Sequence, residues 1–442
     1  MFVVSFFFIF FVVRRTPLKF LVLCGDGMAD FPLAELGGKT PLEMSNTPAM
    51  DAVAKTGIVG LFCPIPEDLT PGSDIGNLSL FGYDPHTTYP GRAPLEAARQ
   101  GISLRSDQVV FRCNLVTLLD GVMASFTSGH IPTEQARDLI HALNEAFASE
   151  GVQFHCGVSY RHLAVVSARD FTIDAFLNTK CTPPHDISDK PYAPHLPQGP
   201  AGEALQRLME KSRSVLSTHP VNEERRRAGL PPATSIWLWG QGKSAEMESY
   251  QRRFGLTGTV ISAVDLVKGI GVCAGLNLVD VPGATGYLDT NYAGKVEAAL
   301  AALETQDFVY LHVEAPDETA HEGRIDLKIK AIEQFDRHVV TPCFEYAQRR
   351  GDCRLFIAPD HITAISTKTH AHGPVPFAAW GPGVDLGGSS VYSESAGRAS
   401  GILVRQGHRL VPHLLTTAHV TVDSIRSLDE SYASSVNLCA SS

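Results

Sequence analysis

The C-terminal half of the chain contains acidic and imidazole side chains at spacings that suit a metal centre. Asp317 and His321 are four residues apart, so one helical turn would place both on the same face. Asp360 and His361 are adjacent, and His370 follows them closely. Carboxylate and imidazole ligands together favour Mn²⁺ or Zn²⁺, whereas sites made of oxygen alone favour Mg²⁺ or Ca²⁺. Either pair alone is more often a salt bridge, so the metal hypothesis depends on both pairs together.

A serine in the N-terminal half has the surroundings of a phosphoryl acceptor. Residues 71–74 have the sequence PGSD, in which glycine before Ser73 permits close backbone approach. A serine where a loop enters a helix would hold phosphate beside free backbone N–H groups. The same four residues in isolation are more often an ordinary helix cap. Because no base is near in sequence, activation of Ser73 would require coordination to a metal.

Three short apolar runs would bring these groups together. The runs cover residues 19–24, 308–313 and 355–358. Each run precedes an acidic residue, respectively Asp26, Asp317 and Asp360. Continuous apolar runs of this length are typical of buried parallel strands, whose carboxyl ends meet where open α/β sheets bind their ligands. The pattern therefore predicts one site at one edge of a sheet.

The elements around these strands predict the fold class. Helices are expected over residues 48–56, 133–147 with Thr133 as N-cap, and 326–346. Residues 181–200 are too rich in proline for regular structure, and residues 157–166 and 236–239 resemble strands. We therefore expect a doubly wound α/β catalytic domain over 19–115 and 261–428. A smaller inserted α/β domain for substrate binding would cover residues 116–260.

Composition restricts the function class. The chain has 442 residues, 44% of them hydrophobic, and a net charge of −10, so no general attraction to nucleic acid or anionic membranes is expected. An anionic substrate would need local arginines, lysines or metal ions. Nine scattered cysteines without a C-x-x-C pair argue against a disulfide framework or a zinc knuckle. They favour a reducing compartment, and we expect a cytoplasmic protein.

The N-terminus is unusually apolar. Residues 1–13 are almost wholly hydrophobic and precede Arg14 and Arg15. This run is shorter than the roughly 20 residues of a membrane span, and it lacks the charge order and cleavage site of a signal peptide. We interpret residues 1–18 as an extension, either a mis-assigned start or a disordered segment, with a weak anchor as the alternative. No stable membrane association is expected.

Long segments of the chain, from about Lys19 to about Ile425, resemble one family. The chain is similar to the archaeal-type, cofactor-independent phosphoglycerate mutases of the alkaline phosphatase superfamily. The matching segments are GDGMADFP, GKTPLEMSNTPAMD, PGSDIGNLSLFGYDP, GRAPLEA, FRCNLVT, GVSYRHL, TPPHDI, ISAVDLVKGIG, PGATGYLDTNY, HVEAPDETAH, KAIEQFD and DH…H…PVPF. The resemblance implies interconversion of 3-phosphoglycerate and 2-phosphoglycerate through a phosphoserine at Ser73, with a small phosphorylated three-carbon acid as substrate.

The resemblance also implies two divalent metal ions, with Mn²⁺ favoured and Mg²⁺, Co²⁺ or Zn²⁺ as alternatives. One metal would bind Asp26, Ser73, Asp360 and His361. The other would bind Asp317, His321 and His370. The family's last histidine stands four residues before the first proline of PVPF, here Pro374, which favours His370 and leaves His372 as the alternative. Residues 362–364 depart from the family, since they are ITA where Ser/Thr-Thr-Pro is expected.

Substrate-binding groups are implied in the same way. The candidates in matching segments are Arg92, Arg112, Arg161 and His162. Planar guanidinium groups suit phosphate and carboxylate, although single arginines commonly form surface salt bridges. Lys295 is a weaker candidate, since a solvated lysine at a helix start explains it equally well.

Three alternatives stay open. The segments SFTSGHIPTEQARDLI and SIWLWGQGK resemble a bacterial branch proposed to be homoserine kinases, and WGQG at 239–242 replaces an R-G-x-G of the mutases. A phosphatase or phosphonate hydrolase would complete the reaction with water. A scaffold protein without catalytic activity is the third alternative. The sequence leaves open whether the chain forms a homo-oligomer.

Overall fold

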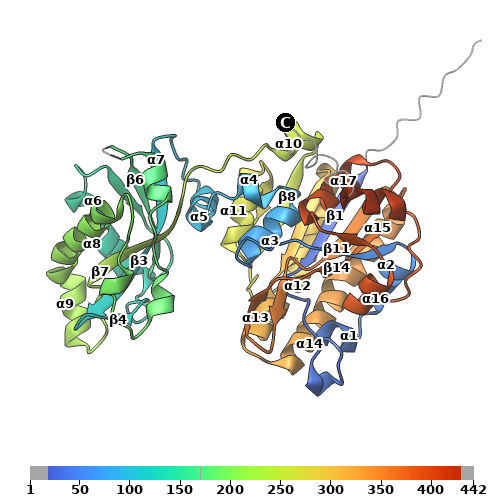
Figure 1. Ribbon diagram of the computed structural model, residues 1–442, viewed down its shortest axis with the longest axis horizontal. Coiled ribbons are helices and arrows are strands. Elements are labelled where there is room, and N and C mark those ends of the chain that lie inside the picture. The colour runs from blue at the N-terminus through green and yellow to red at the C-terminus, as the bar shows by residue number, and fades with distance from the viewer. Residues whose placement is uncertain (1–17, 170, 430–442) are drawn as a thin grey trace, which may run out of the picture.

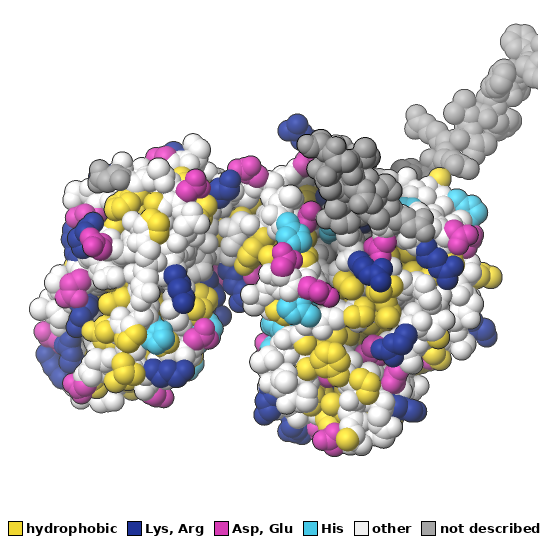
Figure 2. All heavy atoms as spheres, viewed as in Figure 1, with side chains coloured by type: hydrophobic (Ala, Val, Ile, Leu, Met, Phe, Trp, Pro, Cys, Tyr) yellow, Lys and Arg dark blue, Asp and Glu magenta, His cyan; other side chains and the backbone are white. Residues whose placement is uncertain are grey.

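The computed structural model describes residues 18–169 and 171–429, and these residues form two lobes, each built on one main sheet (Figure 1). Residues 1–17, which include the apolar run of the expected extension, lie outside the described residues. Among the described residues, no helix combines the length and the hydropathy that crossing a membrane requires. On the face seen in Figure 2, basic and acidic side chains are interspersed, and no extended basic surface is visible there.

The larger lobe is built on an eight-stranded sheet in the order β15-β2-β14-β11-β1-β10-β8-β9. Its strands are β1 (Lys19–Gly25), β2 (Ile58–Phe62), β8 (Gly258–Ile261), β9 (Asn277–Val279), β10 (Phe308–Val313), β11 (Cys353–Ala358), β14 (Val375–Trp380) and β15 (Leu403–Val404). The central strand β1 is parallel to both β10 and β11, whereas β14 is antiparallel to β11 and β2. The three strands predicted from their apolar runs are thus neighbours.

Helices cover both faces of this sheet. Successive residues of β1 point to opposite sides, and since all of them are buried, both sides need a covering layer. Phe20 and Val22 pack in one core with α3 (Ser73–Leu80), α11 (Asp265–Cys273) and α17 (Leu410–Thr416). Leu21 and Leu23 pack in the other with α2 (Pro48–Lys55), α12 (Tyr292–Thr305), α14 (Ile325–Phe335) and α15 (Thr341–Arg350). The predicted doubly wound α/β arrangement is confirmed.

Shorter elements of the larger lobe lie mostly at the ends of these strands. The helices are α1 (Pro41–Met44), α4 (Pro85–Thr88), α5 (Arg92–Arg99), α10 (Tyr250–Phe254), α13 (Ala315–His321) and α16 (Glu394–Ala399). The strands β12 (Ile362–Ala364) and β13 (Thr369–Ala371) form an antiparallel pair directly after β11. This pair and α13 carry several of the predicted site residues.

The smaller lobe contains an antiparallel five-stranded sheet. Its strands are β3 (Gln108–Leu119), β4 (Val122–Ser125), β5 (Val152–His155), β6 (Arg161–Ser167) and β7 (Ser235–Gly242), and its helices are α6 (Thr133–Ala146), α7 (Ile173–Leu177), α8 (Gly202–Ser217) and α9 (Pro220–Arg227). Helices α6 and α8 pack on one face of β3, and α5 packs on the other. Because β3 pairs with this sheet over its whole length, it crosses the expected boundary at residue 116. The division into domains stays a prediction.

Several local expectations are corrected by the structure. Pro132 is the N-cap of α6, and Thr133 is its first residue, whose Oγ1 accepts a hydrogen bond from the Ser159 N–H. The helix expected over residues 326–346 is interrupted by a π-helical turn at Asp336–Val340. Pro342 follows that turn, and it lacks the N–H that a continuous α-helix would need there. The strand expected over 157–166 begins only at Arg161.

Other local expectations are confirmed. Helix α2 and strand β7 form where expected. The proline-rich segment 181–200 contains no regular helix or strand, only two short 3₁₀ turns at Pro184–Ile187 and Ala193–His195.

A buried ion pair connects α14 to the loops beneath the predicted site. The Lys328 ammonium donates to Asp30 Oδ2 at 2.8 Å, and both side chains are fully buried. It also donates to the carbonyl oxygens of Ala29 at 3.1 Å and Thr363 at 2.7 Å. Since all three of its hydrogens are used, Lys328 fixes the loop after β1 against the β12–β13 pair.

We expect Lys328→Ala to lower the free energy of unfolding by about 3–5 kcal/mol, because it leaves the buried Asp30 carboxylate without its positively charged partner. Thermal and denaturant unfolding measure the effect. The control is Lys330→Ala, which removes an exposed lysine of the same helix and should change stability by less than about 0.5 kcal/mol. Equal stability of the two variants would contradict the role assigned to the ion pair.

Candidate metal and phosphoryl-transfer site

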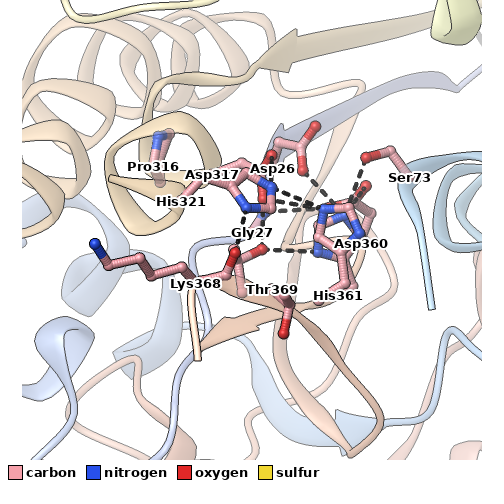
Figure 3. A network of polar contacts seen from close by, with 12 residues as sticks. Asp26, Gly27, Ser73, Pro316, Asp317, His321, Asp360, His361, Lys368 and Thr369 are labelled. Carbon is pink, nitrogen blue, oxygen red and sulfur yellow. Dashed lines mark hydrogen bonds and ion pairs between the residues drawn. The ribbon is translucent and has the colours of Figure 1, made fainter. Parts of the chain in front are cut away.

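The predicted ligands meet at the carboxyl ends of β1, β10 and β11 (Figure 3). Asp26 follows β1, Asp317 lies on α13 after β10, and Asp360 follows β11. Gly27 forms the turn after Asp26 with a φ of +59°, and a Cβ there would clash with Thr363 and Asp317. Only glycine therefore allows the loop after β1 to approach the other two strand ends this closely.

One group of ligands consists of Asp317, His321 and His370. His321 Nε2 lies 3.2 Å from Asp317 Oδ2, and His370 Nε2 lies 3.5 Å from Asp317 Oδ1. The two imidazole Nε2 atoms are 3.1 Å apart. The Nε2 atoms of both imidazoles and the Asp317 carboxylate thus lie close together, in an arrangement that could hold a divalent cation.

The second group consists of Asp26, Asp360, His361 and Ser73. His361 Nε2 lies 3.3 Å from Asp26 Oδ1, 3.4 Å from Asp360 Oδ2 and 3.0 Å from Ser73 Oγ. Ser73 is the first residue of α3, so its hydroxyl lies at a helix N-terminus. Asn77, one turn later in α3, donates to Asp360 Oδ2 at 2.6 Å.

The electrostatics of both groups fit bound cations. Burial, followed by the charges of neighbouring acids, raises the pKa of Asp26 and of Asp360 well above the ordinary value. Asp26 Oδ1 is buried without a hydrogen-bond partner. Burial alone would also raise the pKa of Asp317, but hydrogen bonds from His321 and His370 hold it well below. Burial lowers the pKa of His361 to about 3, which leaves a neutral imidazole with a free lone pair.

The structure distinguishes His370 from His372. On β13, His370 pairs with Thr363 of β12 and faces the ligand groups. His372 is exposed and donates from Nε2 to the Leu69 carbonyl oxygen at 2.8 Å. In the departing ITA segment, Thr363 Oγ1 contacts both the Asp317 carboxylate and His361 Nδ1, so this segment still supports both groups.

A cleft of about 1060 Å³ separates these groups from the smaller lobe. Its lining includes Ser73, Asp317, His321 and His370 on one side. The four predicted substrate-binding residues also line it, namely Arg92, Arg112, Arg161 and His162. The structure therefore brings the metal candidates and the cationic candidates to the same cleft.

The three arginines differ in their partners. Arg92 Nε is 2.9 Å from Asp74 Oδ2, and Arg112 Nη2 is 3.1 Å from Glu96 Oε1. Arg112 also lies over the ring of Trp239, 4.2 Å from its centroid. Among the described residues, Arg161 has no carboxylate within ion-pair distance. Its guanidinium is therefore the most available of the three for an anionic ligand.

His162 and Lys295 take different positions. His162 Nδ1 accepts from the Gly157 N–H at 3.1 Å, and its buried Nε2 has no hydrogen-bond partner. Lys295 is fully buried below the cleft and donates to the His312 carbonyl oxygen at 3.2 Å. The solvated lysine considered as an alternative is therefore wrong, and Lys295 does not line the cleft.

The sequence interpretation missed three polar residues beside the ligands: Asn77, Tyr310 and His312. Asn77 is buried on α3, and the other two are buried on β10. The available signal was two polar side chains in the otherwise apolar run FVYLHV, since a fully buried strand rarely contains them without a partner.

Comparison with known proteins agrees with this geometry. The family model of the 2,3-bisphosphoglycerate-independent phosphoglycerate mutases matches residues 54–222. A mutase of that name from Methanothrix thermoacetophila is 48% identical over 400 residues, which cover 90% of this chain and all of the relative. Mutase 2 of Methanothermobacter thermautotrophicus is 45% identical over 402 residues, or 91% of this chain and 98% of the relative.

Solved structures show the same fold. A protein from Pyrococcus horikoshii has a TM-score of 0.75 at 29% identity and covers 91% of this chain and 98% of its own. The cofactor-independent phosphoglycerate mutase of Thermoplasma acidophilum has a TM-score of 0.64 at 24% identity, over 91% of this chain and all of its own. By its near full-length similarity to curated relatives, the chain belongs to the family of 2,3-bisphosphoglycerate-independent phosphoglycerate mutases.

Proposed function

We propose that this chain interconverts 3-phosphoglycerate and 2-phosphoglycerate through a phosphoserine at Ser73, with two divalent cations bound beside it. The observation that carries the proposal is that Ser73, Asp317, His321 and His370 line a cleft that arginines also line, with Asp26, Asp360 and His361 buried directly beside them. The names of the relatives favour phosphoglycerate over homoserine as the substrate.

Two ligand sets would hold the cations, one formed by Asp317, His321 and His370 and the other by Asp26, Ser73, Asp360 and His361. When bound, the cations would lower the pKa of the serine hydroxyl and neutralise charge on the phosphoryl oxygens. Mixed carboxylate and imidazole ligands favour Mn²⁺, with Mg²⁺, Co²⁺ or Zn²⁺ as alternatives.

The chain's own residues supply the nucleophile and its orientation. Ser73 Oγ would attack phosphorus in line with the C3 oxygen, so that the Ser73 O–P bond forms and the P–O bond to C3 breaks. The proton that Ser73 loses is matched by the proton that the released C3 oxygen gains. The C2 hydroxyl of the bound glycerate then attacks the phosphoserine, and Ser73 recovers its proton.

Arginines that line the cleft would retain glycerate between these two steps. Arg161 is available for the substrate carboxylate as a two-pronged donor. Arg92 and Arg112 keep fixed orientations through Asp74 and Glu96. Loss of glycerate, or entry of water, would convert the mutase into a phosphatase, so retention of glycerate decides the outcome.

We expect Ser73→Ala to lower mutase activity by at least about 10⁴-fold, because it removes the atom to which the phosphoryl group is transferred. Formation of 2-phosphoglycerate from 3-phosphoglycerate is followed through coupled enolase, with homoserine plus ATP in a parallel assay. Substrate labelled with ³²P should leave covalent label on the wild type and none on the variant. Turnover by a folded Ser73→Ala protein would exclude the phosphoserine intermediate. If the wild type phosphorylates homoserine and shows no mutase activity, homoserine would replace phosphoglycerate as the proposed substrate.

Removal of metal should abolish activity reversibly. Chelation is expected to stop turnover and lower the melting temperature, since the buried carboxylates then repel one another. Adding Mn²⁺ at 100 times its Kd should restore about 2.7 kcal/mol of stability per site. The matched pair His370→Ala and His372→Ala tests the ligand assignment, because only the first should weaken Mn²⁺ binding. Full activity of thoroughly chelated protein would contradict the metal proposal.

Arg161→Lys is expected to raise KM for 3-phosphoglycerate about 10- to 100-fold, which corresponds to the roughly 1.5–3 kcal/mol of a hydrogen bond to a charged group. Steady-state kinetics measure this. The control is Arg105→Lys, which alters an exposed arginine that is paired with Asp107. An unchanged KM in Arg161→Lys would place the carboxylate clamp elsewhere in the cleft.

A further inference from the structure

Strand β10 presents two buried polar side chains, Tyr310 and His312, toward the Ser73 side of the site. They are two residues apart and therefore lie on the same face of the sheet. Parallel pairing with β1 fixes their register, with Val22 opposite Tyr310 and Cys24 opposite His312. The Asp26 N–H donates to the Val313 carbonyl oxygen at 2.9 Å, which continues this pairing to the ligand. His312 contacts the Asp26 carboxylate directly, and Tyr310 is connected to the Asp360 carboxylate through one further residue.

His312 connects Asp26 to the cleft loop that follows β8. Its Nε2 lies 2.9 Å from Asp26 Oδ2, and its Nδ1 lies 3.1 Å from Ser262 Oγ. Ser262 Oγ accepts from the Val264 N–H at 2.9 Å, so its own hydrogen is free to be donated to Nδ1. This chain of donors places the imidazole proton on Nε2, toward Asp26. While Oδ2 contacts His312, Asp26 Oδ1 has no hydrogen-bond partner and lies 3.3 Å from His361 Nε2.

Tyr310 acts on Asp360 through Asn77. The Tyr310 hydroxyl donates to Asn77 Oδ1 at 2.6 Å. The Asn77 amide nitrogen then donates to Asp360 Oδ2 at 2.6 Å and to the Ser73 carbonyl oxygen at 2.9 Å. An asparagine amide has two orientations of similar shape, and the tyrosine hydroxyl favours the one with nitrogen toward the carboxylate. The other oxygen, Asp360 Oδ1, accepts from the Gly27 N–H at 3.2 Å.

We propose that Tyr310 and His312 are positioning residues. They would hold Asp360 and Asp26 in the orientation that binds the cation of the second group, which contains Ser73. The inference rests on the proposed function, because it presumes a cation in that group. Within the part of the chain that the structure describes, Tyr310 and His312 form no hydrogen bond or ion pair with Asp317, His321 or His370, so the two cation sites should respond differently to substitution. Hydrogen bonds to ligand carboxylates commonly contribute 10- to 100-fold to metal affinity.

The test is direct Mn²⁺ titration, in which free Mn²⁺ is measured by electron paramagnetic resonance. We expect two bound ions in the wild type. Tyr310→Phe and His312→Leu should each weaken one of them about 10- to 100-fold and leave the other unchanged. Tyr310→Phe keeps the ring stacked on Phe81 and removes only the hydroxyl. His312→Gln retains an N–H near the position of Nε2 and should recover much of the affinity that His312→Leu loses.

Two controls make the result specific. Tyr292→Phe removes the hydroxyl of a buried tyrosine on α12, whose partner is Gln334, and should leave both affinities unchanged. A His370→Ala background removes a ligand from the group that contains Asp317 and His321. Mn²⁺ binding in that background therefore measures the site that contains Asp26 and Asp360. Melting temperatures of metal-free proteins show whether each variant is folded.

The outcomes separate the two proposals. Two bound ions in the wild type with unchanged affinities in Tyr310→Phe and His312→Leu would overturn the positioning role and leave the proposed function intact. Equal weakening of both sites, or no recovery in His312→Gln, would also overturn it. A wild type that binds no cation would overturn the proposed function and this inference together.

Discussion

Mutual repulsion among buried acids is the constraint on which the rest of this structure depends. Ligand atoms of Asp26, Asp317 and His361 all lie within 4.8 Å of one another, and Asp360 lies beside them. Carboxylates this close in a dry environment cannot all remain ionised unless positive charge is present. The proposed cations would supply that charge, so the same arrangement that destabilises the metal-free protein would generate the binding affinity.

The parallel strands β1, β10 and β11 make this concentration of charge feasible. Their pairing is continuous and buried, so their carboxyl ends are held rigidly side by side. Lys328 contributes the buried positive charge below the site, where it neutralises Asp30 rather than the ligands. The N-terminus of helix α3 points toward the ligands and places Ser73 beside them. At Gly76, any Cβ would clash with the Asp360 carbonyl oxygen, which shows how closely α3 packs there.

Under the proposed function, substrate recognition would be divided between the two main sheets. The larger sheet positions Ser73 and the ligands, and the smaller one brings Arg112, Arg161 and His162 to the other wall of the cleft. Helix α5 packs against both lobes and carries Arg92, which is paired with Asp74 next to the serine. An anionic substrate that contacts both walls would therefore connect the two lobes through charge.

The sequence by itself predicted three neighbouring strands of the larger sheet and the candidate ligands that follow them, because apolar runs and adjacent acids are local features. It also favoured His370 over His372 through motif spacing. Tertiary structure alone decided that Lys295 is buried and that, among the described residues, Arg161 lacks an acidic partner. It also revealed the roles available to Asn77, Tyr310 and His312. Several of these facts depend on contacts between residues far apart in the sequence, such as Tyr310 and Asn77 or His312 and Asp26, and local pattern has no information about such contacts.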